Sequence, residues 1–80
     1  MNIKVLGSGC KNCKKLYENV KESVKNLNIQ AEIEYVTDMM EIANYGLLRT
    51  PGLVINEKIV SYGKVNSVEE VTTIIKNLIK

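Results

Sequence analysis

A strand, a long helix and a second strand are predicted in succession at the start of the chain, and this order constrains the fold more than any other feature. Residues 2–6 are an apolar run before a Gly-Ser-Gly turn, which is typical of a short buried strand. Residues 31–36 alternate apolar and acidic side chains, the pattern of an edge strand with one face in water. Because the crossover in such a unit is right-handed, the two strands are expected to be parallel. Between them, residues 10–27 carry an apolar stripe at helical spacing, formed by Cys13, Leu16, Tyr17, Val20, Val24 and Leu27.

A short second helix is predicted after the second strand. Asp38 with Glu41 three residues later resembles a capping box, and Gly46 is a typical C-terminal stop. Of the adjacent residues Met39 and Met40, at most one is expected to face the core, and packing is favoured over binding of a soft metal. The expected apolar face consists of Met39, Ile42 and Ala43.

A hairpin and a final helix complete the predicted order. Residues 53–55 and 58–61 read as strands on either side of Asn56-Glu57, where Asn tolerates a positive φ. Ser67 with Glu70 forms a capping box that starts an apolar helical pattern running to the end of the sequence. The order βαβαββα predicts an α/β fold, in which one four-stranded mixed sheet carries helices on both faces.

Composition limits the class of protein. Eighty residues with a 45% apolar fraction predict one domain spanning residues 1–80. The apolar runs are too short for a membrane span or a signal-peptide core, and a net charge of +2 is too small to indicate nucleic-acid binding. Two cysteines do not suggest a secreted disulfide scaffold, so a cytoplasmic protein is expected. With no long exposed apolar stripe in the pattern, a monomer is expected.

The two cysteines, Cys10 and Cys13, form a C-x-x-C motif where the first strand gives way to the first helix. Unpaired N–H groups and the positive end of the helix dipole stabilise a thiolate there. Cys13 belongs to the apolar stripe, whereas Cys10 lies one turn earlier, nearer to solvent. We therefore predict a catalytic pair in which Cys10 is the nucleophile and Cys13 the resolving thiol.

Lysines surround this motif. Lys11, Lys14 and Lys15 occupy the first turns of the helix, where acidic residues are normally favoured. One interpretation is an ordinary solvated lysine face. Because positive charge also stabilises a thiolate, we favour the interpretation that Lys11 and Lys14 lower the pKa of the nearby thiol.

A metal site is the main alternative to thiol exchange. Structural zinc needs about four nitrogen or sulfur ligands, and a chain with two cysteines and no histidine offers too few, so no resident metal or other cofactor is expected. A two-thiolate carrier for Cu(I) or arsenic remains an alternative function. Copper carriers of this kind usually end in a strand, whereas residues 67–80 predict a helix, and they lack a Thr-Pro loop like Thr50-Pro51.

Two segments together resemble a known family. Gly7-Ser8-Gly9-Cys10-Lys11-Asn12-Cys13 and Thr50-Pro51-Gly52-Leu53-Val54-Ile55, in this order of elements, resemble the small glutaredoxin-like redox-active disulfide proteins of bacteria and archaea, which have the thioredoxin fold. The resemblance covers essentially the whole chain. It implies a thiol-disulfide oxidoreductase that reduces or exchanges protein disulfides, with roles in electron transport and cell redox homeostasis.

The resemblance also implies site residues. Thr50-Pro51 would be a cis-proline that packs beside the cysteines. Thr50, Pro51 and Arg49 would flank the groove in which an extended substrate segment pairs with the backbone. For Arg49, a solvated loop cation is the alternative interpretation.

Three departures from better-known relatives refine this expectation. Thioredoxins carry a buried acid six residues before the nucleophile, where this chain has Lys4, so Cys13 would need another base or solvent. The two residues between the cysteines are Lys11 and Asn12, where thioredoxins have Gly and Pro. Residues 62–66 lack the Gly-Gly-x-Asp-like segment of glutathione-using glutaredoxins. We therefore expect weak glutathione dependence and reduction by a flavin-linked donor of the thioredoxin-reductase type.

Overall fold

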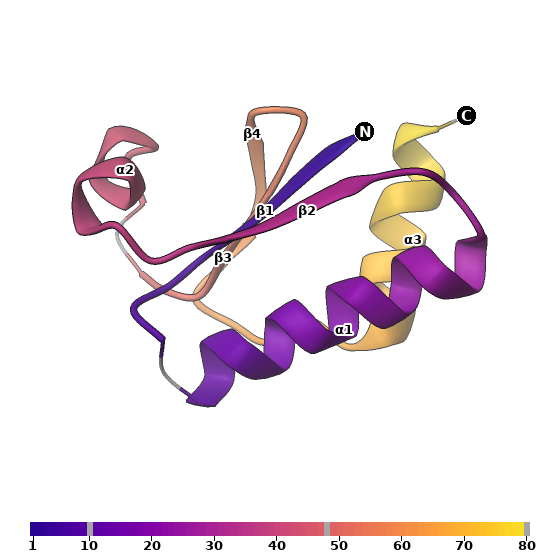
Figure 1. Ribbon diagram of the computed structural model, residues 1–80, viewed down its shortest axis with the longest axis horizontal. Coiled ribbons are helices and arrows are strands. Elements are labelled where there is room, and N and C mark those ends of the chain that lie inside the picture. Colours follow the sequence, from indigo (N-terminus) through magenta and orange to yellow (C-terminus); the bar gives the residue numbers. More distant parts are fainter. Residues whose placement is uncertain (10, 48, 80) are drawn as a thin grey trace.

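The computed structural model describes residues 1–9, 11–47 and 49–79, and its elements follow the predicted order (Figure 1). The bounds differ from the predicted ones by at most a few residues, as is usual at element ends. The strands and helices are β1 (Asn2–Leu6), α1 (Lys11–Leu27), β2 (Glu32–Val36), α2 (Met39–Asn44), β3 (Gly52–Ile55), β4 (Lys58–Tyr62) and α3 (Val68–Leu78).

The strands form one mixed sheet in the order β2-β1-β3-β4. β1 and β2 are parallel, with Ile3 opposite Ile33, as the crossover through α1 predicts. β3 lies antiparallel to β1, with Leu6 opposite Gly52, and the β3–β4 hairpin completes the sheet. The predicted four-stranded mixed sheet and the edge position of β2 are therefore confirmed.

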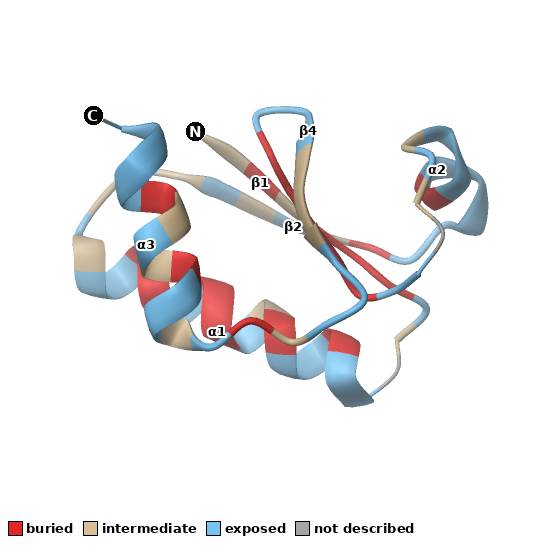
Figure 2. Ribbon diagram, turned by 180° about the vertical axis from the view of Figure 1, so that it is seen from behind, coloured by how far each residue is buried: buried red, intermediate tan, exposed pale blue. Residues whose placement is uncertain are grey.

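Helices cover both faces of the sheet (Figures 1 and 2). Alternate residues of β1 and β3 face α1 and α3, and they form the larger core with the stripe of α1. On the other face, Leu6, Val36 and Val54 pack with Ile42 of α2. No helix in the described ranges is long and apolar enough to cross a membrane.

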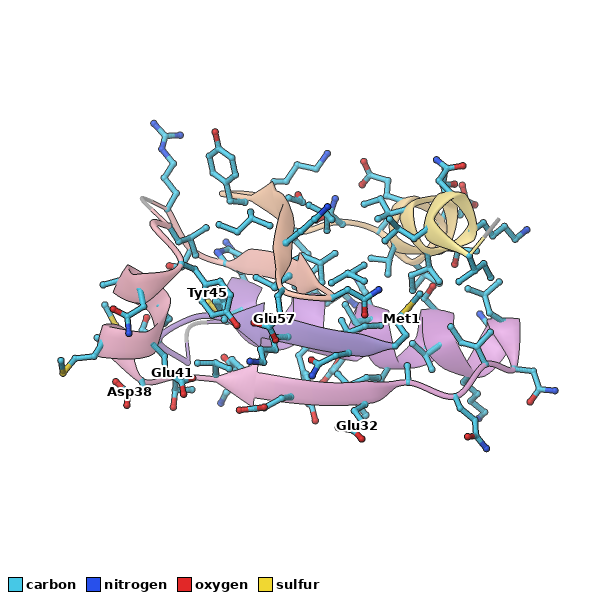
Figure 3. All side chains as sticks on the ribbon, turned by 90° about the horizontal axis from the view of Figure 1, so that it is seen from above. Met1, Glu32, Asp38, Glu41, Tyr45 and Glu57 are labelled. Atoms are coloured by element: carbon cyan, nitrogen blue, oxygen red, sulfur yellow. The ribbon has the colours of Figure 1, made fainter. Side chains whose placement is uncertain are left out.

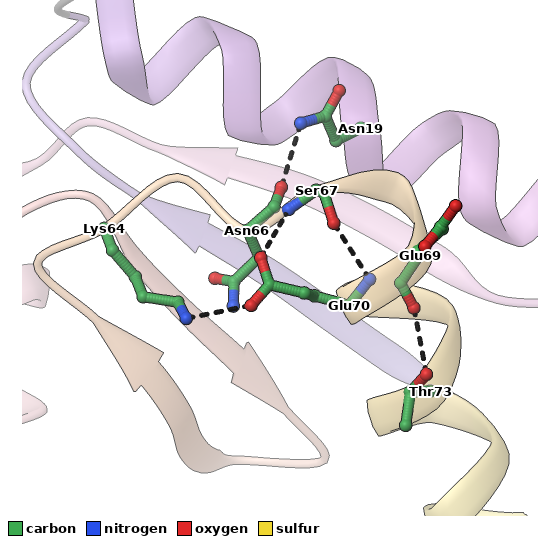
Figure 4. A network of polar contacts seen from close by, with 7 residues as sticks. All are labelled: Asn19, Lys64, Asn66, Ser67, Glu69, Glu70 and Thr73. Carbon is green, nitrogen blue, oxygen red and sulfur yellow. Dashed lines mark hydrogen bonds and ion pairs between the residues drawn. The ribbon is translucent and has the colours of Figure 1, made fainter.

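The predicted stripe of α1 packs as expected, and polar residues extend it. Cys13, Leu16 and Val20 are fully buried. Asn19 and Ser23 are also buried, although the apolar pattern does not include them, because they face α3 and the loop before it. Hydrogen bonds satisfy both: Asn19 Nδ2 donates to the Asn66 carbonyl at 2.9 Å (Figure 4), and the Ser23 and Thr72 hydroxyls lie 2.6 Å apart.

The predicted apolar face of α2 is wrong except at one residue. Ile42 is buried, but Met39 is 61% exposed, Met40 is 77% exposed and Ala43 is also exposed. A helix of six residues makes less than two turns, so it presents a single side chain to the sheet. Asp38 does cap the helix, although it accepts from the Met40 N–H rather than in a complete capping box.

The hairpin and the last helix begin as predicted. Asn56 and Glu57 both have positive φ, and Asn56 is further held by hydrogen bonds to both backbone groups of Asn2. Before α3, the Ser67 hydroxyl accepts from the Glu70 N–H, and the Glu70 carboxylate accepts from the Ser67 N–H (Figure 4). This capping box confirms the predicted start of α3.

Candidate active site

The predicted resolving residue, Cys13, lies in the first turn of α1 with its side chain fully buried. Its sulfur is disulfide-bonded. The burial agrees with the position of Cys13 on the apolar stripe. The predicted nucleophile, Cys10, lies outside the described residues.

Gly7 brings the end of β1 directly against Cys13. A Cβ atom on Gly7 would lie 2.7 Å from the Cys13 Cβ and closer still to Sγ, so no larger side chain fits. The backbone of Gly7 is fixed as well, because its N–H donates to the Val36 carbonyl at 3.0 Å. The sequence identifies Gly7 only as part of a turn, whereas its role in the structure is close contact with Cys13.

Pro51 lies at the same end of the sheet. The pairing of Leu6 with Gly52 places Pro51, which precedes Gly52, beside Gly7 at the end of β1. Pro51 is buried, and the Thr50–Pro51 peptide bond is cis. Two segments that are far apart in the sequence, the start of α1 and the proline loop, therefore meet through Gly7.

The residues before Pro51 are accessible. Thr50 and Arg49 are both exposed. The stem of Arg49 packs on Gly63, since a Cβ on Gly63 would lie 3.3 Å from the Arg49 Cδ. Gly63 has a φ of +73°, and its N–H donates to the Pro51 carbonyl at 2.9 Å. The Arg49 stem thus packs beside Gly63, a contact that the sequence pattern does not reveal.

The predicted thiolate-stabilising lysines lie on the solvent side of the same turn as Cys13. Lys11 and Lys14 are exposed, and the first turn of α1 contains no acidic residue. Positive side chains and the N-terminal end of the helix dipole therefore reinforce one another here.

Lys4 takes part in a separate network on the α2 face of the sheet. Its Nζ donates to the Tyr45 hydroxyl at 2.9 Å, and that hydroxyl donates to Glu57 Oε2, also at 2.9 Å. Tyr45 and Glu57 lie close together in Figure 3. Lys4 and Glu57 also form an ion pair at 3.4 Å. The network joins β1, the end of α2 and the β3–β4 turn.

This network shifts two pKa values in opposite directions. The hydrogen bond from Tyr45 lowers the pKa of Glu57, and the charge of Lys4 lowers it further. The hydrogen bond to Tyr45 raises the pKa of Lys4, and Glu57 adds to this effect. Both shifts favour the charged forms.

Acid titration of Glu57 is expected to weaken the fold. A folded-state pKa below the unfolded value of about 4.3 contributes stability above that pH, and the contribution is lost as the pH falls through the folded-state pKa. Glu57→Gln should therefore reduce the slope of a plot of the free energy of unfolding against pH between about pH 5 and pH 3. Chemical denaturation across that range measures the slope. Tyr45→Phe should flatten it too, and a slope unchanged in both variants would contradict the assignment.

Within the described part of the chain, no group of three or more His, Cys, Asp or Glu side chains could hold a metal ion. Cys13 and its surroundings have three features that bear on thiol chemistry. These are a buried sulfur at a helix N-terminus, close contact with a glycine, and a neighbouring proline loop with exposed residues before it.

Comparison with known proteins agrees with this arrangement. A family model described as "Thioredoxin domain" matches residues 1–76. A protein named "Thioredoxin" from Methanocaldococcus jannaschii is 44% identical over 78 residues, covering 98% of this chain and 90% of the relative. Another protein with that name, from Methanothermobacter thermautotrophicus, is 40% identical over 75 residues, covering 94% of this chain and 97% of the relative. With its fold and the position of Cys13, these matches establish that the chain belongs to the thioredoxin family of thiol-disulfide oxidoreductases.

Proposed function

We propose that this protein reduces or exchanges protein disulfides with Cys10 as the nucleophile and Cys13 as the resolving thiol. The observation that carries the proposal is the placement of Cys13, which is disulfide-bonded and buried in the first turn of α1, against Gly7. Cys10 is the other cysteine of the chain and completes the C-x-x-C motif. A buried sulfur cannot meet a protein substrate first, so the initial attack is assigned to Cys10.

The exchange proceeds in two steps that balance. The Cys10 thiolate attacks one sulfur of the substrate disulfide, forming a mixed disulfide, while the other substrate sulfur leaves as a thiolate and takes up a proton. Cys13 then loses its proton and attacks the Cys10 sulfur, which closes the Cys10–Cys13 disulfide and releases the second substrate thiolate. Two electrons pass to the substrate, and a dithiol donor returns them to the protein. A flavin-linked reductase of the thioredoxin-reductase type is our proposed donor.

The residues around Cys13 have distinct proposed roles. Lys11 and Lys14 favour the Cys10 thiolate, because they add positive charge where the helix dipole is positive. Lys4 does not replace the acid of other thioredoxins as a proton acceptor, since it is held by Tyr45 and Glu57 on the α2 face. The proton of Cys13 therefore passes to solvent or to the leaving thiolate.

The proposed substrate site is the backbone before Pro51. Thr50 and Arg49 are exposed there, and Gly63 holds the Pro51 carbonyl through its N–H. An extended substrate segment would pair with this backbone and bring its disulfide to Cys10. Pro51 has no N–H of its own, which leaves the approach of a second backbone open.

Trapping of mixed disulfides tests the assignment of roles. Cys13→Ser should accumulate substrate adducts on Cys10, because the resolving step is blocked while the first attack remains. Cys10→Ser is the matched control and should form none. Non-reducing electrophoresis with mass spectrometry of the adducts after incubation with insulin reads out both variants. Equal adduct formation in the two variants, or none in Cys13→Ser, would refute the proposed mechanism.

A further inference from the structure

We propose that Arg49 selects disulfide substrates that carry an acidic side chain next to the reactive cysteine. The inference rests on the proposed function, and it names the class of substrate that the site prefers. Its basis is the position of the Arg49 side chain, the charges around the start of α1, and the absence of an ion-pair partner for Arg49 among the described residues.

The stem of Arg49 packs beside Gly63. Gly63 has no side chain, and the Cδ and Cβ atoms of Arg49 occupy the space beside it, 3.3 and 3.4 Å from where a Cβ would lie. Gly63 in turn donates its N–H to the Pro51 carbonyl. The stem of Arg49 therefore lies against a residue that is itself bonded to the loop on which a substrate would dock. A stem with fewer free rotamers loses less side-chain entropy when its guanidinium binds a ligand.

The guanidinium of Arg49 is available for a ligand. Across residues 1–9, 11–47 and 49–79, the ion pairs are Lys4–Glu57 and Lys64–Glu70, and neither involves Arg49. The residue is exposed. A guanidinium presents a planar fork of donors that fits both oxygens of a carboxylate. An Asp or Glu side chain of a bound peptide is the complementary partner.

The surrounding charges favour the same substrates. Lys11 and Lys14 are exposed in the first turn of α1, near the end of β1 that Pro51 adjoins. The acidic residues at this end include Glu41 of α2 and Asp38, the N-cap of that helix, and α2 packs on the opposite face of the sheet (Figure 3). An acidic side chain is thus attracted on the α1 side and repelled on the α2 side, which orients the substrate as well as attracting it.

Matched peptides test the inference. Three end-blocked peptides with one internal disulfide would differ only in the residue after the first cysteine, which is Asp, Asn or Lys. We expect kcat/KM to be about fivefold higher for the Asp peptide than for the Asn peptide, the size of an exposed ion pair, and lowest for the Lys peptide. The preference should appear mainly in KM, and it should shrink as salt is raised from about 20 to 300 mM.

Variants separate Arg49 from general charge. In Arg49→Gln, the ratio of kcat/KM for the Asp peptide to that for the Asn peptide should fall close to one. Arg49→Lys keeps the charge and should retain part of the preference for the Asp peptide. Lys25→Gln removes the same charge from the last turn of α1, at the far end of that helix, and should keep the wild-type ratio. Equal rates for the Asp and Lys peptides, or the same loss of preference in Lys25→Gln and Arg49→Gln, would overturn the inference. Absence of turnover with all three peptides would contradict the proposed function itself, and the inference with it.

Discussion

Replacing Gly7 with alanine is expected to destabilise the protein by about 1–3 kcal/mol and to impair disulfide exchange severely. The added Cβ would overlap the Cys13 side chain, and neither backbone can yield easily. Gly7 is held in the sheet by its hydrogen bond to Val36, and Cys13 is part of α1. The clash must therefore displace Cys13 from the end of β1. Thermal unfolding and an insulin-reduction assay measure the two effects.

Gly9→Ala is the matched control for this prediction. Gly9 has a φ of +88°, but a Cβ there would meet no atom of the residues that the structure describes within 4 Å. Its substitution should therefore cost only the strain of a left-handed backbone, about 1–2 kcal/mol, without displacing Cys13. Exchange by Gly9→Ala should remain well above that of Gly7→Ala. If the two variants exchange disulfides equally well, the contact between Gly7 and Cys13 is not required for the chemistry.

The second large effect is expected from Leu16→Ala, at about 2–5 kcal/mol. Leu16 is fully buried in the core formed by α1, α3 and the sheet, three residues after Cys13. Natural domains are stable by only about 5–15 kcal/mol, so this loss is a large share of the total. The melting temperature of a chain of this size should fall by at least about 10 °C, measured by circular dichroism with the disulfide intact.

Lys15→Ala serves as the control for Leu16→Ala. Lys15 is the preceding residue on α1 and is exposed, so its truncation should change stability by no more than about 0.5 kcal/mol. Alanine has the highest helix propensity, so neither substitution should weaken α1 itself. A comparable loss in both variants would contradict the assignment of this stability to burial of the Leu16 side chain in the core.

Much of the fold is predictable from local sequence patterns because these patterns reflect local physics. The stripe of α1 identifies the side that packs on the sheet, and Ser67 with Glu70 marks the start of α3. Alternation in β2 reveals an edge strand. Each feature depends on residues only a few positions apart, so spacing alone identifies it. The prediction that Met39 faces the core is wrong because α2 has only six residues, which are too few for periodicity to define a face.

The site divides in a similar way. The C-x-x-C motif, the lysines of the first turn and the Thr50-Pro51 segment are recognisable in the linear sequence. The contact between Gly7 and Cys13, the packing of Arg49 beside Gly63 and the network of Lys4, Tyr45 and Glu57 are not, because their partners come from different elements. Local spacing along the chain is enough to predict which elements form and which residue types carry the chemistry. It is not enough to predict which of these residues meet, because long-range contacts depend on the register of the sheet and on packing across it.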